Sequence, residues 1–278
     1  MPGYIGLGLL IATFIVTYQG LRHTLLMERY QFWVDGVRVH RDYKRLFTSI
    51  FLHMSWGHFV LNVLGIFFIG GMMEATLGPV AFALLYLASG VGGNALLLWL
   101  KRYEPGYTTM GATGAISGVL FAAVALFPQS TMMLVFIPMK AWFFGLAFMI
   151  LTIWGIRSGR GGVAYEAHLG GALAGMMIGL LLQPQALTAN WIYITAVTVP
   201  ALVFLYIAAR KPQLLHVDLF PSSGRQPARV LNLEDRYNSD KKIRQEEIDR
   251  ILDKIHRKGM GGLTARERQL LKEYSAKG

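Results

Sequence analysis

The chain has 278 residues, of which 54% are apolar and 15% are charged, and its mean hydropathy is +0.41. Soluble domains carry roughly 45–50% apolar and about 25% charged residues, so this composition argues against a soluble globular enzyme and against a disordered chain. The net charge is +11, and most of the excess lies in the last quarter. A multi-span membrane protein with a basic tail fits these numbers. Cysteine is absent, which excludes disulfides and a cysteine nucleophile.

Seven stretches are predicted to cross the membrane, because each approaches the roughly 20 mainly apolar residues that a transmembrane helix needs. They are Tyr4–Tyr18, His58–Leu77, Val80–Leu100, Gly111–Phe127, Ala141–Trp154, Ala167–Leu182 and Trp191–Ala209. No basic segment precedes the first stretch, so it is predicted to be a retained span rather than a cleaved signal peptide. The fourth stretch is the least hydropathic. The sequence therefore predicts an all-α, polytopic membrane protein.

The predicted domains are a transmembrane core over 1–183 with a long first loop over 22–57, a seventh span over 184–209, and a basic soluble tail over 210–278. A loop as long as the first one usually has structure and function of its own. In the tail, apolar residues at helical spacing and a capping box from Thr264 to Glu267 predict a helical hairpin over 241–275. Acidic and basic residues alternate there, which favours a solvated accessory or partner-docking element over nucleic-acid binding.

Polar residues within spans are costly and mark candidate functional sites. Gly111-Ala112-Thr113-Gly114 opens the fourth span with a hydroxyl between two glycines. Small residues allow backbones to approach closely, and N–H groups at a helix start favour developing negative charge. A nucleophile with an oxyanion site needs this combination. Plain helix packing would account for the glycines equally well.

Two further polar positions lie on helix faces. His168 falls in Ala167–Gly175, whose small residues give a flat face, where a histidine can act as general base or be a buried structural residue. His58 and Asn62 are four residues apart, so both can donate to an oxyanion, or pack or cap. His53 and His58 raise the possibility of a metal. However, a His-Glu-x-x-His motif and cysteine are both missing, so neither a metal site nor a cofactor is predicted.

Together these features resemble the rhomboid intramembrane serine proteases over about residues 4–182. The motifs are Arg45–His53, similar to the end of the family's first loop; His58-x-x-x-Asn62; Gly111–Gly114, where the family has Gly-x-Ser-Gly; and Ala167–Gly171, similar to its sixth-helix histidine motif. Each motif is weak alone, but their combination in this order is specific. The seventh span resembles the bacterial form with one additional C-terminal helix.

The resemblance implies a Ser–His dyad in a water-filled cavity among six helices, which cleaves transmembrane segments of other proteins. Carried over, His168 is the general base, and His58, Asn62 and the N–H of Thr113 form the oxyanion hole. The supporting positions that it implies are Gly111, Gly114, Gly170, Gly171, the structural acid Glu74, and Arg45 as a hydrogen-bonding residue of the first loop. It also implies a bacterial inner-membrane location, with the bilayer and transmembrane segments as partners.

The departure from the family lies at the nucleophile, where this chain has Thr113. Threonine keeps the hydroxyl, but its methyl group restricts χ1, and a misplacement of about 1 Å can cost on the order of 100-fold in rate. Known threonine nucleophiles use their own terminal amine as base, whereas the internal Thr113 has to rely on His168. Ser117, one turn further on, is a weaker candidate nucleophile.

Two hypotheses therefore follow from the sequence. The chain is a working intramembrane endopeptidase with an unusual nucleophile, or it is a catalytically inactive rhomboid-like protein, natural or substituted, that binds transmembrane helices. A transporter or channel ranks last, because duplicated halves are lacking and the interior carboxylates are few.

Charge and family resemblance predict opposite orientations. With seven spans, every Lys and Arg except Lys140 falls on the side of the first loop, where the mouth of the site and the tail also lie. The positive-inside rule places this side in the cytoplasm. The resemblance implies the reverse for most bacterial members, so the sequence leaves both orientations open.

Overall fold

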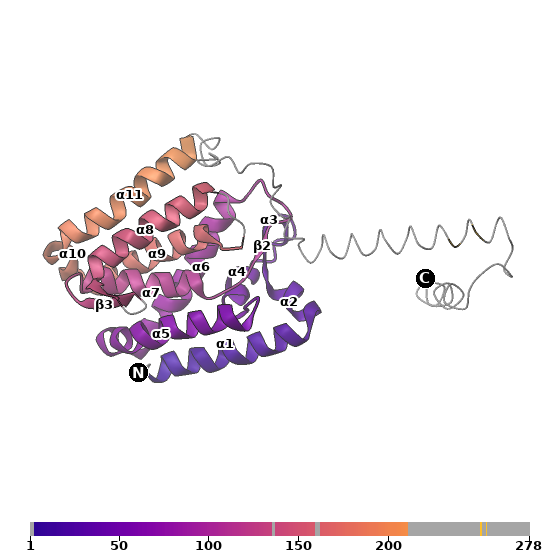
Figure 1. Cartoon of the computed structure of the whole chain (residues 1–278), viewed down its shortest axis with the longest axis horizontal. Coiled ribbons are helices and arrows are strands. Elements are labelled where there is room, and N and C mark those ends of the chain that lie inside the picture. The colour runs from indigo at the N-terminus through magenta and orange to yellow at the C-terminus, as the bar shows by residue number, and fades with distance from the viewer. Residues whose placement is uncertain (1–2, 135–136, 159–161, 211–250, 252–253, 255–278) are drawn as a thin grey trace. The chain divides into compact units, whose positions relative to one another are not determined.

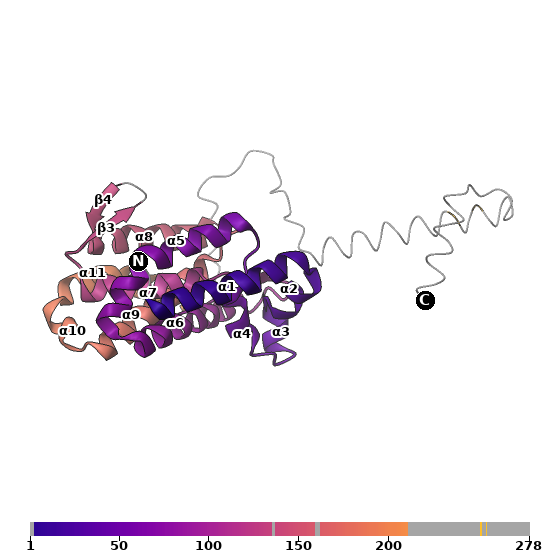
Figure 2. The ribbon, with the colours of Figure 1, turned by 90° about the horizontal axis from the view of Figure 1, so that it is seen from below.

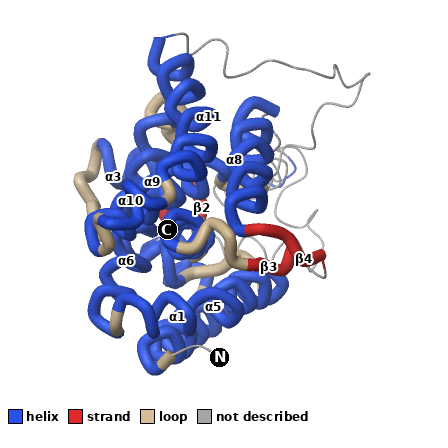
Figure 3. Tube along the Cα trace, turned by 90° about the vertical axis from the view of Figure 1, so that its left-hand side faces the viewer, coloured by secondary structure: helices blue, strands red, loops and turns tan. Residues whose placement is uncertain are grey.

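The computed structural model describes residues 3–134, 137–158, 162–210, 251 and 254. The chain divides into two units, residues 1–221 and 222–278, and every element named below lies in the first unit. Helices make up most of it, with two small strand pairs (Figure 3). The helical hairpin predicted over 241–275 falls almost wholly outside the described residues and stays a prediction.

Six described helices are long and apolar enough to cross a membrane. They are α1 (Tyr4–Arg22), α5 (Trp56–Leu77), α6 (Pro79–Leu100), α8 (Ala141–Ser158), α9 (Tyr165–Leu182) and α11 (Trp191–Arg210). A seventh, α7 (Thr113–Leu126), is a shorter apolar helix. The all-α, polytopic prediction is confirmed. One predicted boundary moves because Ser55 caps α5: its Oγ accepts a hydrogen bond from the N–H of His58 at 3.2 Å, so the helix begins before His58.

The short α7 lies at the centre of the bundle, packed against α5, α6 and α9, and most of its residues are buried. Its 14 residues span about 21 Å, less than the hydrocarbon core of about 30 Å. The chain therefore enters from the segment after α6 and starts α7 below the end of the bundle. We therefore expect Thr113, the first residue of α7, to lie within the depth of the membrane.

Glycines bring α9 into backbone contact with two neighbours. A Cβ added at Gly171 would lie 2.0 Å from the carbonyl oxygen of Gly114 on α7. A Cβ added at Gly170 would lie 2.9 Å from the carbonyl oxygen of Gly92 on α6. No side chain fits at such distances, so the glycines fix how closely α7 and α9 approach. We call the contacts of Gly171 with Gly114 and of Gly175 with Gly118 the glycine seam.

The first loop is folded. It contains α2 (Thr24–Tyr30), β1 (Phe32–Trp33), α3 (Val34–Arg38), α4 (Arg45–Thr48) and a 3₁₀ turn, η1 (Ser49–Phe51). The short β1 pairs antiparallel with β2 (Thr108–Thr109), which ties the loop to the segment leading into α7. Arg45 holds the loop together, because its Nη1 donates to the carbonyl oxygens of Glu28 and Gln31, each at 2.8 Å.

The other end of the bundle carries β3 (Thr131–Leu134), β4 (Ile137–Lys140) and the short α10 (Gln185–Ala189), opposite α2 to α4 (Figures 1 and 2). There Glu74, near the end of α5, accepts hydrogen bonds from the N–H groups of Ile5 at 3.0 Å and Gly6 at 2.8 Å. A carboxylate at a helix N-terminus satisfies otherwise unpaired donors and the helix dipole. The strand pairs were not predicted.

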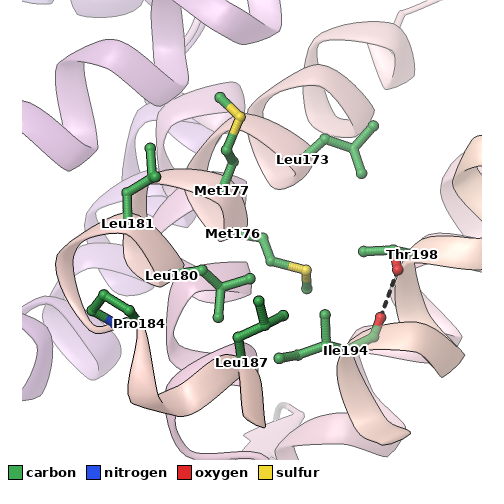
Figure 4. Close-up of a pocket in the computed structure, with 9 residues that line it drawn as sticks. All are labelled: Leu173, Met176, Met177, Leu180, Leu181, Pro184, Leu187, Ile194 and Thr198. Atoms are coloured by element: carbon green, nitrogen blue, oxygen red, sulfur yellow. Dashed lines mark hydrogen bonds between the residues drawn. The ribbon is translucent and has the colours of Figure 1, made fainter. Parts of the chain in front are cut away.

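An apolar cavity of about 400 Å³ lies between α9, α10 and α11 (Figure 4). Side chains from all three helices converge on it, among them Met176, Leu187 and Ile194. Its one hydroxyl, on Thr198, already donates to the carbonyl oxygen of Ile194 at 2.7 Å. The cavity therefore presents no free reacting group.

Candidate functional site

A second pocket, of about 540 Å³, lies at the first-loop end, between α5, α7, α8 and the start of α9. It is lined by the polar residues Ser55, His58, Asn62, Thr109, Thr113, Ser117 and His168, and by apolar residues that include Met54, Leu61, Met110, Ile116, Phe148 and Val163. The four residues predicted to carry catalysis thus share one cavity, although they come from three helices.

The turn before α7 gives Thr113 its position. Gly111 has φ +138°, a conformation that favours glycine, and its N–H donates to the carbonyl oxygen of Ser49 at 3.0 Å. A Cβ at Gly111 would lie 2.6 Å from Cε1 of His58, so the imidazole packs directly on the turn. The first N–H groups of a helix lack intrahelical acceptors and form the positive end of its dipole. The start of α7 therefore offers donors for an oxyanion beside His58.

His168 lies in α9, with two rings against its imidazole. Phe148 of α8 stacks on it, with ring centres 6.0 Å apart, and Tyr165 meets it edge-on at 5.8 Å. Within the described part of the chain, no hydrogen bond joins the Thr113 hydroxyl to His168. Catalytic hydrogen bonds are often long without substrate and tighten only in the complex, so the shared pocket leaves the pair able to act together. Sequence reasoning missed Phe148, whose place in an apolar span gives no distinguishing signal.

His58 and Asn62 lie one turn apart on α5. Asn62 Nδ2 donates to the carbonyl oxygen of His58 at 2.8 Å, which leaves its second N–H for the pocket. Nδ1 of His58 and Oδ1 of Asn62 are buried and have no partner among the described residues. Unpaired buried polar groups are rare in native proteins and often have a functional reason. Oδ1 of Asn62 can only accept a hydrogen bond, whereas the second N–H of its Nδ2 and a ring N–H of His58 can donate to a group that enters the pocket.

His53 links α1 to the turn before Thr113. The hydroxyl of Thr17 donates to the carbonyl oxygen of Phe51 at 3.1 Å, so it accepts at 3.0 Å from His53 Nδ1. Nε2 of His53 then accepts from the N–H of Ala112 at 3.4 Å. Burial, and secondly the charge of His58, lowers the pKa of His53 to about 3, so its imidazole is neutral. The sequence showed this histidine as a possible metal ligand and as the last residue of the Arg45–His53 motif, but not as a link to Thr17 and Ala112.

Ser117 lines the same pocket, but its hydroxyl donates back to the carbonyl oxygen of Thr113 at 2.8 Å, and the residue is 4% exposed. This bond within α7 occupies the only proton of the hydroxyl. The geometry therefore favours Thr113 over Ser117 as the group that faces a substrate.

The supporting positions divide into two groups. Gly111 and Gly114 shape the turn and the contact with α9, and Gly170 and Gly171 meet the backbones of α6 and α7. Glu74 and Arg45 are described above and do not line the pocket.

Glu166, two residues before His168, is buried and lies 3.4 Å from Nζ of Lys101. Burial lowers the pKa of Lys101, but the attraction of Glu166 and then Glu104 outweighs it and raises that pKa overall. Glu166 therefore balances a cation at the base of α9 and is not aimed at the dyad.

Comparisons with known proteins identify the family. The model of the Rhomboid domain matches residues 40–185, a segment that contains Thr113, His168, His58 and Asn62. The chain belongs to the rhomboid family. A second model, of a family of unknown function (DUF6576), matches residues 231–277, in the tail.

Three relatives illustrate the range of rhomboid similarity. RHOMBOID-like protein 12, mitochondrial, of Arabidopsis thaliana is 30% identical over 184 residues, which covers 60% of this chain and 54% of the relative. Rhomboid protein 1, mitochondrial, of Saccharomyces cerevisiae is 32% identical over 47% of this chain and 39% of its own length. Presenilin-associated rhomboid-like protein, mitochondrial, of Homo sapiens is 30% identical over 47% and 36%. The chain thus spans about half or less of the length of these relatives.

Proposed function

We propose that this rhomboid is an intramembrane endopeptidase that cleaves transmembrane segments of other membrane proteins. The observation that carries the proposal is that one pocket is lined by Thr113, His168, His58 and Asn62 together. In this mechanism the Thr113 hydroxyl oxygen attacks the scissile carbonyl, and its proton passes to an imidazole nitrogen of His168. His58, Asn62 and the N–H of Thr113 donate to the oxyanion of the tetrahedral intermediate.

His168 then returns the proton to the leaving amine as the peptide bond breaks, and an ester to Thr113 remains. Water, deprotonated by His168, hydrolyses the ester, releases the new carboxylate and restores the hydroxyl. A transmembrane helix has all its backbone groups paired internally, so the scissile bond has to leave its helix before attack. A pocket of about 540 Å³ that combines polar and apolar lining residues supports this step.

The second candidate function is binding of transmembrane helices without cleavage. It is favoured by one observation, the methyl group of Thr113 in a turn bounded by Gly111 and Gly114. That methyl removes rotamer freedom from the hydroxyl that has to face both His168 and the substrate carbonyl. The same pocket would then hold an unwound segment without reacting.

The test compares cleavage of a single-span model substrate by the full-length protein in liposomes. The unmodified chain, Thr113→Ser, His168→Ala and Ser117→Ala are assayed side by side. We expect slow cleavage by the unmodified chain, about 100-fold faster cleavage by Thr113→Ser, no cleavage by His168→Ala, and retained cleavage by Ser117→Ala. Cleavage that begins only when serine is installed would overturn the proposal for this chain and favour helix binding.

The kind of membrane belongs to this proposal as well. The chain is a multi-pass membrane protein, and the relatives described above are all named mitochondrial. These names lend no support to the bacterial inner membrane that the sequence suggested. Fractionation of the source cells, with detection of the full chain in each membrane, identifies the compartment.

A further inference from the structure

Three spans end at the mouth side of the bundle with the same pair of side chains, an arginine over an aromatic ring. The guanidinium carbon lies 4.6 Å from the ring centre for Arg22 over Tyr18, 5.1 Å for Arg102 over Trp99, and 5.7 Å for Arg210 over Tyr206. Each arginine follows its ring by three or four residues, the spacing of neighbours on a helix face. We call these three arginines the arginine rim.

All three pairs of arginine and aromatic ring lie at the same end of the helix bundle. Arg22 and Arg210 are the last residues of α1 and α11, whereas Arg102 lies in the turn after α6, where Tyr103 also meets its guanidinium at 4.7 Å. These helix ends lie at the first-loop end of the bundle (Figure 1). The rings are partly open, with Tyr18 and Trp99 each 39% exposed and Tyr206 64% exposed. Tyr and Trp gather where bilayer meets water, and arginine extends from there toward the headgroups. We therefore expect the rim to lie at headgroup level, at the same end of the bundle as the pocket.

The protein does not neutralise this charge within its described part. The ion pairs found there bring carboxylates to Lys44, Arg45 and Lys101, and none to the rim. The opposite end of the bundle carries a single basic residue, Lys140. Guanidinium groups match phosphate oxygens with several parallel donors. Arg102 Nη1 donates to the carbonyl oxygen of Trp99, but none of the three guanidiniums has a carboxylate partner among the described residues, so a phosphate can supply the countercharge there.

We propose that the arginine rim binds the phosphates of anionic phospholipids in the leaflet on the mouth side. The aromatic rings fix the depth of each guanidinium, and the lipid phosphates supply the missing countercharge. Binding of this kind holds the mouth of the pocket at headgroup level. It does not depend on whether the pocket cleaves or only binds its substrates.

The test measures lipid preference by tryptophan quenching in liposomes, with brominated phosphatidylglycerol competing against brominated phosphatidylcholine. The full-length protein is compared with the triple variant Arg22→Gln, Arg102→Gln, Arg210→Gln, and with Lys140→Gln as the matched control on the other face. We expect the unmodified protein to prefer phosphatidylglycerol. Each arginine removed should lower the preference for phosphatidylglycerol about fivefold, and Lys140→Gln should leave this preference unchanged.

Salt at 1 M reduces the preference of the unmodified protein, because charge at a surface is screened within about 3 Å at that concentration. If the triple variant fails to fold, the same comparison uses Arg102→Gln and Arg102→Lys singly, and only the variant that keeps the charge retains the preference. The proposal is overturned if the unmodified protein shows no preference, if the triple variant retains it, or if Lys140→Gln loses as much.

Discussion

His53 joins two parts of the site through one neutral ring. It accepts from the N–H of Ala112 and donates to Thr17, so only one tautomer satisfies both contacts. Protonation of Nε2 would turn this acceptor into a second donor, which would face the N–H of Ala112 and break the hydrogen bond. The imidazole is therefore a positioning group for the turn that presents Thr113.

The low pKa of His53 makes the stability of the protein depend on pH. Because its pKa is about 3 in the folded protein, against about 6.5 when unfolded, the unfolded chain binds a proton that the folded chain does not. Stability contributed by the neutral imidazole is present above pH 6.5 and is lost as the pH falls toward 3, by about 1.4 kcal/mol per pH unit. We expect the thermal midpoint in detergent to drop between pH 7 and pH 5.

The variant His53→Gln isolates this effect, because glutamine does not titrate and its amide oxygen can still accept from Ala112. Its thermal midpoint starts lower at pH 7 but should vary less with pH. An equal acid-induced drop in His53→Gln would assign the effect to another group.

The functional residues differ in how far they could be predicted. Thr113, His168 and Asn62 lie in apolar spans, where polar side chains are rare because they are costly, so each stands out in the sequence. His53 lies in a loop, where histidine is ordinary, and its role depends on Thr17 far away in the chain. Phe148 is one of 16 phenylalanines, and only the packing of α8 against α9 distinguishes it.

At the level of elements, the glycine seam determines how Thr113 and His168 meet. Gly171, one turn from His168, and Gly114, the residue after Thr113, put the backbones of α9 and α7 in contact. In Gly171→Ala the new methyl would lie 2.0 Å from a carbonyl oxygen, which no rotamer change can relieve. The helices must separate, at a cost of about 3 kcal/mol.

We therefore expect Gly171→Ala to lower the thermal midpoint and, in an active background such as Thr113→Ser, to lower kcat more than KM. Gly8→Ala is the matched control, because a Cβ at Gly8 in α1 meets nothing within 4 Å. It should leave both stability and cleavage nearly unchanged. Equal losses in the two variants would show that helical glycines matter here through flexibility and not through the seam.

The positions of the helices could be predicted from the sequence better than the contacts between elements. Length and hydropathy located the long spans, because a bilayer demands about 20 apolar residues of any helix that crosses it. They also ranked Gly111–Phe127 as the least hydropathic stretch, which is wrong, because α7 is as apolar as the other helices and differs from them in being short. The pairing of Phe32 with Thr109 was not predictable, since strands of two residues show no periodicity.

At the scale of the whole molecule, the distribution of charge distinguishes the two ends of the bundle. The described mouth side carries the arginine rim and the basic first loop, and the other end carries Lys140. The positive-inside rule and the family resemblance give opposite orientations for this arrangement. Both orientations require the two ends to face opposite aqueous compartments.

Because the chain has no cysteine, a single introduced thiol reports its own side of the membrane. Val39 is 67% exposed on the mouth side, and Thr188 is exposed in α10 at the other end. We expect a membrane-impermeant maleimide, added to sealed vesicles, to label Val39→Cys or Thr188→Cys but not both. Lysing the vesicles should allow both to react.

In vesicles whose outward-facing side is known, the variant that the maleimide labels shows which side of the membrane the mouth of the pocket faces. Labelling of Val39→Cys from the inside alone agrees with the charge rule, and the arginine rim then faces the inner leaflet. Labelling from the outside alone agrees with the resemblance to bacterial members. In that case the arginine rim would still bind anionic lipid although the orientation departs from the positive-inside rule. Binding of headgroups and direction of insertion are separate effects of the same charge. Labelling of both thiols from one side in sealed vesicles would contradict the arrangement of spans itself.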